Sequence, residues 1–179
     1  MIRLMRRLAA RFRREEGTAT VEFVLAIPVL MTIFMASFES GMFMVRHVML
    51  EQALDHVMRD LRLGVMGASI THDQLRDAVC DRTVIIKDCR NSLKVELQPI
   101  STETFRMPAI PTGCIDRSAA INPSTTPVAG GSNEPMIVRV CVLQKPMFPM
   151  TGVGLRLRQN AVTGEYGLVA MSVFANEPR

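Results

Sequence analysis

Two glutamates beside a long apolar segment are the residues whose chemistry most needs explaining. Residues 23–38 carry no charge; Glu22 directly precedes them and Glu39 directly follows them. An ionised carboxylate near the centre of a membrane-spanning helix costs roughly 2.5 to 3.5 kcal/mol. A position near the outer interface of the bilayer that the helix spans, where this cost falls, is enough to account for Glu39. Glu22 either marks the cytoplasmic headgroup level or has an electrostatic role of its own.

Four cysteines offer a second kind of chemistry: Cys80, Cys89, Cys114 and Cys141. In an oxidising compartment we expect them to form disulfides, for which three connectivities are possible. We favour Cys80 with Cys89, closing a short loop, and Cys114 with Cys141, tying a long loop to a strand. Zinc is the competing interpretation, but there is no C-x2-C pair and no histidine near the cysteines in sequence.

The three histidines do not suggest a metal site. His47 and His56 are nine residues apart on one predicted helix, which places them on opposite faces, and we expect His72 to be solvated. The sequence has no G-x-S-x-G, no H-E-x-x-H, no phosphate-binding glycine loop and no paired catalytic carboxylates outside the apolar segment. We therefore expect no catalytic site, metal, cofactor or small-molecule substrate.

The net charge of +4 comes from the N-terminal leader. Residues 1–16 hold six arginines and two glutamates, whereas basic and acidic residues are equal in number from Gly17 onward. The rest of the chain has no net field to hold a polyanion, which argues against nucleic-acid binding. Arginines before an apolar run are typical of the retained side of a membrane insertion signal.

The apolar run predicts a membrane-spanning helix at about residues 21–45. As a helix, residues 23–45 cover about 35 Å, enough for a hydrocarbon core of ~30 Å. No small-residue cleavage site follows, so we expect the segment to stay attached. The arginines predict that the N-terminus stays in the cytoplasm. The C-terminal domain would then lie on the opposite, outer side of the membrane. The flank behind the run is balanced, with Arg46, Arg59 and Arg62 against Glu51, Asp55 and Asp60.

The residues between leader and apolar run resemble the prepilin peptidase site of type IV pilin-like proteins. Gly17 is followed by Thr-Ala-Thr-Val, then by Glu22 and Phe23, where the apolar helix begins. The resemblance implies cleavage after Gly17 by a prepilin peptidase, which makes Thr18 the first residue and Glu22 the fifth. The new amine would lie at the helix start, and Glu22 one turn along can neutralise it. In such families this carboxylate is also thought to pair with a neighbouring subunit's amine.

A longer part of the chain resembles the TadE-like pseudopilins of the Tad (Flp) pilus. The matching features are Pro28, Glu39-Ser40-Gly41, the amphipathic extension, Pro146-Met-Phe-Pro149 and Asn176-Glu177-Pro178. TadF, a sister minor pilin, is an open alternative within this group. Pro28 additionally predicts a kink or local unwinding of the helix, because proline removes a helix hydrogen bond.

The TadE-like resemblance implies a set of partners. They are the prepilin peptidase, other minor pilins, the major Flp pilin, an inner-membrane assembly platform and the lipid bilayer. Glu22, Pro28 and Glu39 would then be the residues in filament or assembly contacts.

We expect three parts: a basic cytoplasmic leader (1–17), a transmembrane helix continuing as an amphipathic stem (18–63), and a disulfide-containing extracytoplasmic domain (64–179). The stem shows apolar residues at spacings of four, three and four, at Leu50, Leu54, Val57 and Leu61. We expect this stripe to pack on the protein's own sheet, with a partner helix as the alternative. Gly64 is expected to cap the stem.

A second helix is predicted from Thr71 to about Cys80. Thr71 can cap its start while Gln74 reaches back, and Ile70 and Leu75 are placed to staple the first turn.

After this helix the period of the pattern changes to two. Leu93, Val95 and Leu97 alternate with polar residues, which predicts a half-buried strand, and two more strands are predicted near residues 136–144 and 166–175. Helices followed by strands predict an α+β fold, with a small antiparallel sheet packed on the stem as in pilins.

Two irregular segments separate the predicted strands. Residues 107–135 are rich in proline and too long for an ordinary connection, which indicates a binding loop or a flexible one. Residues 145–165 are less polar and are expected to fold onto their own domain, with a contact surface for another pilin as the alternative.

Together these features favour a minor pilin or pseudopilin of the inner membrane that acts structurally in the initiation, assembly or anchoring of a Tad-type filament. The alternative keeps the anchor uncleaved and makes the outer domain a tethered binding module or, less favoured, an enzyme for an envelope ligand.

Overall fold

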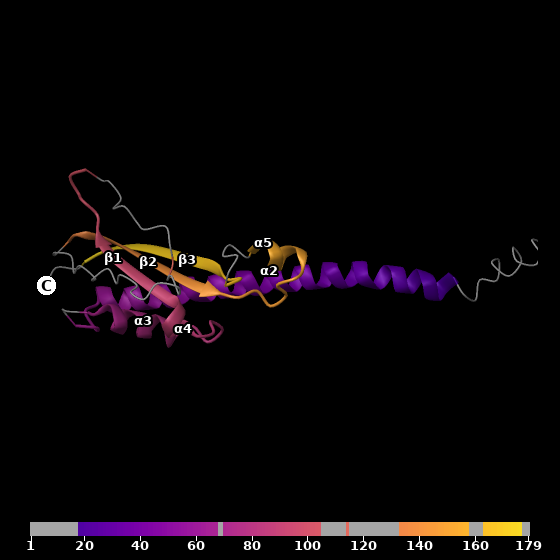
Figure 1. Cartoon of the computed structure of the whole chain (residues 1–179). Coiled ribbons are helices and arrows are strands. Elements are labelled where there is room, and N and C mark those ends of the chain that lie inside the picture. The colour runs from indigo at the N-terminus through magenta and orange to yellow at the C-terminus, as the bar shows by residue number, and fades with distance from the viewer. Residues whose placement is uncertain (1–17, 68–69, 105–113, 115–132, 158–162, 177–179) are drawn as a thin grey trace, which may run out of the picture.

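The structure, a computed structural model, describes residues 18–67, 70–104, 114, 133–157 and 163–176. One long helix, α2 (Thr18–Arg62), projects at one end and joins a small mixed domain at the other (Figure 1). The remaining elements are α3 (His72–Cys80), α4 (Cys89–Ser92), β1 (Leu93–Pro99), β2 (Pro135–Gln144), α5 (Gly152–Leu157) and β3 (Tyr166–Ala175). The predicted α+β fold, with a long N-terminal helix and a small antiparallel sheet, is confirmed.

Helix α2 is continuous through Pro28. Proline at this position cannot donate a hydrogen bond to the carbonyl one turn back. The helix nevertheless continues through Pro28 without a break, so the local unwinding that we considered does not occur, and the kink stays a prediction.

The C-terminal end of α2 is closed by a glycine motif. Gly64 has a φ of 72° and its N–H donates to the Leu61 carbonyl at 3.0 Å, while the N–H of Val65 donates to the Asp60 carbonyl at 3.0 Å. This pair of bonds satisfies carbonyls that the helix end leaves open, and it requires a residue that adopts positive φ without strain. The predicted cap at Gly64 is confirmed.

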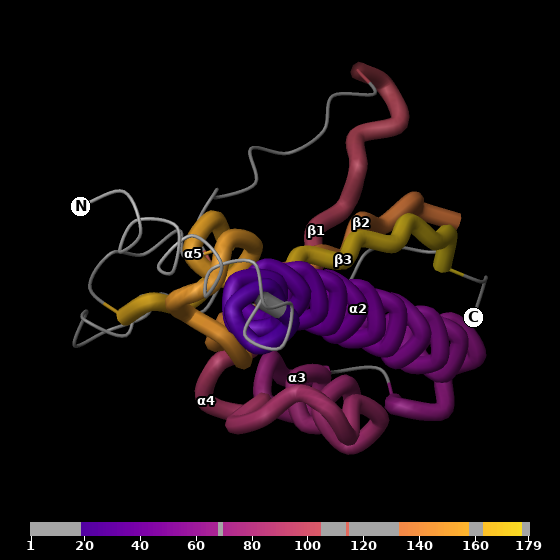
Figure 2. Tube along the Cα trace, turned by 90° about the vertical axis from the view of Figure 1, so that its right-hand side faces the viewer, coloured from indigo at the N-terminus to yellow at the C-terminus, as the bar shows by residue number. Residues whose placement is uncertain are grey.

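The sheet is antiparallel throughout, in the order β1-β2-β3. The C-terminal half of α2 contacts both β3 and α3, and Figure 2, a view along α2, shows the sheet and α3 on different sides of this helix. Leu50, Leu54 and Val57 of the stem stripe are at most 1% exposed. The prediction that the stripe packs on the protein's own sheet is therefore correct.

Strand β1 departs from simple alternation at Glu96. Leu93, Val95 and Leu97 are buried as predicted, but Glu96 is also only 4% exposed. It lies directly opposite Arg139 of β2, whose guanidinium approaches its carboxylate at 3.1 Å, and Lys94 approaches it at 2.8 Å. A cross-strand ion pair thus replaces the exposed polar face that we expected here.

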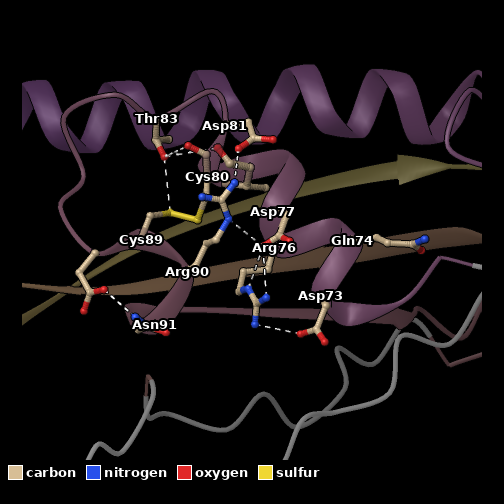
Figure 3. A network of polar contacts seen from close by, with 12 residues as sticks. Asp73, Gln74, Arg76, Asp77, Cys80, Asp81, Thr83, Cys89, Arg90 and Asn91 are labelled. Carbon is tan, nitrogen blue, oxygen red and sulfur yellow. Dashed lines mark hydrogen bonds and ion pairs between the residues drawn. A yellow bond between two sulfur atoms is a disulfide. The ribbon is translucent and has the colours of Figure 1, made fainter.

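Helix α3 starts as predicted, with a capping box in which the N–H of Gln74 donates to the Thr71 hydroxyl and the N–H of Thr71 donates to the Gln74 amide oxygen. At its other end Cys80 forms a disulfide with Cys89, next to a network of ion pairs on the same surface (Figure 3). The network consists of Asp73, Arg76, Asp77, Asp81 and Arg90. A second disulfide joins Cys114 to Cys141 of β2, so both favoured pairs occur in the structure.

Candidate functional site

The N-terminal part of the candidate site is the start of α2. Thr18 is the first helical residue, and Glu22 and Phe23 follow on the next turn with both side chains exposed. Gly17 and the basic leader lie outside the described residues. The structure therefore places Glu22 one turn from Thr18 on an uncovered helix, and the predicted processing event itself stays a prediction.

No described part of the chain covers the first turns of α2. Every residue from Ala19 to Phe34 is exposed, although most are apolar. Hydroxyl groups farther along the helix donate to carbonyls of the preceding turn: Thr32 to Val29, Ser37 to Ile33 and Ser40 to Ala36, at 2.8 to 2.9 Å. An apolar helix that satisfies its own polar groups is suited to hydrocarbon. Among the described residues α2 alone is long and apolar enough to cross a membrane.

Glu39 lies in a different environment from Glu22. Its side chain is 0% exposed, and both carboxylate oxygens accept backbone hydrogen bonds from a segment more than 100 residues later in the chain. The N–H of Met147 donates to Oε1 at 3.1 Å, and the N–H of Phe148 donates to Oε2 at 2.8 Å. Glu39 therefore fixes the loop after β2 to the side of α2.

Packing around this loop reinforces the two hydrogen bonds. Phe148 packs edge-on against Phe38, with ring centroids 6.0 Å apart. The carbonyl of Phe148 accepts from the Thr151 hydroxyl at 2.9 Å, and a Cβ at position 154 would overlap this carbonyl, which explains Gly154. The expectation that residues 145–165 fold onto the protein itself holds for Phe148, which packs on α2. It does not hold for Met147, Met150 and Leu155, whose side chains are exposed.

Arg46 is a second buried polar group on α2. It is 4% exposed, and Nη1 donates to the Tyr166 hydroxyl at 2.7 Å and to the Lys145 carbonyl at 3.1 Å. Arg46 is one of the charges that flank the apolar run, and no local sequence pattern indicates that its side chain is buried. Arg46 thus joins α2 to the start of β3 and to Lys145, just after the end of β2. Lys145 directly precedes the loop that Glu39 holds.

The structure separates the three residues for which assembly contacts were predicted. Glu22 and Glu39 are 17 positions apart on one helix, or about 26 Å along its axis, and Pro28 lies between them. They form no common cluster. The carboxylate–loop contact of Glu39 was missed, because the sequence shows the glutamate and the Pro146–Pro149 stretch but not that they meet.

Metal-ligating groups do not gather in the part of the chain that is described: no set of three or more His, Cys, Asp or Glu residues is placed to hold an ion. His72, which we expected to be solvated, is only 18% exposed, and its Nε2 accepts a hydrogen bond from the N–H of Val95 at 3.3 Å. Its role is to join α3 to β1.

Comparison with protein families gives a match to the N-terminal part of the chain. The model of a family described as "TadE-like protein" matches residues 17–59, from Gly17 through the uncovered helix and most of the stem. The resemblance that we inferred from the leader, the apolar helix and its glutamates is thereby confirmed over this segment. No curated protein and no solved structure matches the chain.

Proposed function

Since residues 17–59 form a TadE-like segment, which associates the chain with the Tad pilus, we propose that the protein is a minor pilin or pseudopilin of a Tad pilus machine. It is inserted once into the inner membrane, with its N-terminus in the cytoplasm and residues 64–179 outside. A prepilin peptidase removes the leader after Gly17. The observation that carries this proposal is that the family match begins at the predicted cleavage residue and continues through a bare apolar helix.

The helix serves two purposes in this proposal. In the membrane it stores the subunit, because a bare apolar surface of this length is stable in hydrocarbon and unstable in water. During assembly the same surface becomes the contact with other minor pilins and with the major pilin. The role is structural, and the assembly platform of the inner membrane is the expected site of action.

Glu22 supplies the specific contact. Cleavage would leave an ammonium group at Thr18, one helical turn from the exposed carboxylate of Glu22. Opposite charges attract strongly where neighbouring helices exclude water. Glu22 can therefore balance the amine of its own chain in the membrane and that of an adjacent subunit in the filament.

The substitution Glu22→Ala tests this role. Membrane insertion should survive, because removing a charge from an apolar helix lowers the cost of insertion. Filament assembly should fall about tenfold or more, since loss of ~1.4 kcal/mol per contact already corresponds to a factor of ten. Membrane fractionation and pilus counts in complemented cells measure the two effects separately.

Glu51→Ala is the matched control, because Glu51 is an exposed glutamate on the same helix but beyond the apolar part. It should leave piliation unchanged. Unchanged piliation in Glu22→Ala would reduce Glu22 to a marker of the membrane interface.

A further inference from the structure

Residues 145–157, here called the collar segment, expose apolar side chains although the segment is firmly attached to α2. Met147 is 47% exposed, Met150 85% and Leu155 58%. The segment contains two basic residues, Lys145 and Arg156, and no acidic one. An exposed group of apolar side chains with a basic margin indicates a surface that meets something other than water.

The position of the collar segment along α2 indicates what this surface contacts. Its helix α5 lies beside α2, close to where the bare part of the helix ends, and both views agree on this (Figures 1 and 2). Phe38 and Glu39 are the residues of α2 that contact Phe148 and Met147. The collar segment is thus fixed at the level of residues 38–39.

The length of the bare helix shows how deep this level is. Residues 19–34, all exposed, cover about 24 Å as a helix, which is less than the ~30 Å of a hydrocarbon core. The remaining few ångströms of the hydrocarbon core must be spanned by residues 35–38. Removal of the leader after Gly17 leaves almost no helix before residue 19 that could span them instead. This step rests on the proposed function, in which α2 spans the bilayer from Thr18. The outer edge of the hydrocarbon then reaches the collar segment.

We propose that the collar segment lies in the outer interface of the lipid bilayer, with Met147, Met150 and Leu155 in the acyl-chain boundary. Lys145 and Arg156 are exposed and carry the charge that phosphate headgroups attract, and side chains of this kind can bury their aliphatic stems while the charged end stays in water. Glu39 is a positioning residue: its hydrogen bonds hold the segment against α2 at the correct depth. The domain consequently has a fixed height and tilt on the membrane before assembly.

Lipid fits this surface better than a protein partner does, because the collar segment continues a surface that is already apolar. Phe34 and Phe38 of the bare helix are 62% and 43% exposed, their rings stack, and Phe38 in turn contacts Phe148. The apolar surface therefore passes without interruption from the spanning helix to the collar.

Single-tryptophan variants test the proposal directly, because the chain contains no tryptophan. The protein, with its leader removed, is reconstituted into phosphatidylethanolamine and phosphatidylglycerol vesicles carrying bromine on the acyl chains, and tryptophan emission is recorded. Met150→Trp should show blue-shifted, strongly quenched emission. Val65→Trp, at a residue 74% exposed just past the end of α2, should be unquenched, because residues 39–62 of α2 place it about 35 Å along the helix from the collar. Ile33→Trp in the bare part of α2 should be quenched.

The outcomes separate the collar proposal from the membrane anchor. Quenching of Ile33→Trp without quenching of Met150→Trp overturns the collar and leaves the anchor intact. A blue shift of Met150→Trp without bromine quenching means that protein covers the collar, which also overturns the proposal. Absence of quenching at Ile33→Trp overturns the spanning helix and the collar together.

Glu39→Gln, added to Met150→Trp, tests the positioning role. A carboxamide accepts hydrogen bonds at one oxygen only, so one of the two N–H groups of Met147 and Phe148 loses its partner. We expect weaker quenching and a red shift relative to Met150→Trp alone, with Glu51→Gln as the unaffected control. Equal quenching with and without Glu39→Gln would remove Glu39 from the account of the collar.

Discussion

Glu22 and Glu39 flank the same apolar segment but lie in opposite environments. Glu22 is exposed on a bare helix, whereas Glu39 is fully buried and accepts two backbone hydrogen bonds. Between Pro146 and Pro149, which have no N–H, the only donors of the loop backbone are those of Met147 and Phe148. Glu39 satisfies both, so its carboxylate is part of the fold, while that of Glu22 is exposed, as the proposed contact with another subunit requires.

Replacement of Glu39 by alanine should therefore destabilise the domain. Hydrogen bonds to a charged acceptor contribute about 1.5 to 3 kcal/mol each, and the two N–H groups would lose their partner. We expect a loss of at least ~2 kcal/mol in the free energy of unfolding, measured by denaturant titration in detergent. Glu51→Ala, on an exposed turn of the same helix, should change it by less than ~0.5 kcal/mol. Equal stability of the two variants would show that the loop does not depend on Glu39.

At the scale of elements, α2 combines two helices of different character in one rod. Its N-terminal part is apolar on all sides and uncovered, and its C-terminal part has one stripe buried by β3 and α3. The rod stops where Gly64 adopts positive φ and turns the chain toward α3. The end of α2 thus determines how the domain is mounted on the helix.

Gly64→Ala tests the importance of this stop. A Cβ at a φ of 72° costs about 1 kcal/mol, because L-residues avoid this conformation. The melting temperature should fall by a few degrees. Gly41→Ala is the matched control, since a Cβ there meets nothing within 4 Å in the helix interior and alanine favours helix over glycine. A Gly64→Ala protein as stable as the Gly41→Ala protein would contradict the capping role.

Local patterns predicted most elements, and contacts distant in sequence account for what was missed. The capping box at Thr71, the stem stripe and the full extent of β3 follow from neighbouring residues. The bonds of Glu39 and Arg46 join residues separated by 99 to 120 positions, and no local pattern encodes them. Helix α5, with two glycines in six residues, has low intrinsic propensity and is supported by its contact with α2.

At the scale of the whole molecule, one half of a long helix is left bare and the other half carries the domain (Figure 1). This division suits a subunit that waits in a membrane and later exchanges lipid for neighbouring helices. In the proposed function this exchange requires a free N-terminus next to Glu22, because a leader with six arginines would hold positive charge at the cytoplasmic face. Removal of the leader is therefore the central claim.

The intact mass of the protein extracted from membranes tests this claim most directly, in cells with and without the prepilin peptidase. With the peptidase present we expect a chain that begins at Thr18 and lacks residues 1–17, and without it the leader should remain attached. A chain that keeps its leader under both conditions, in cells where other pilin precursors are trimmed, would contradict the account and favour a permanently tethered outer domain.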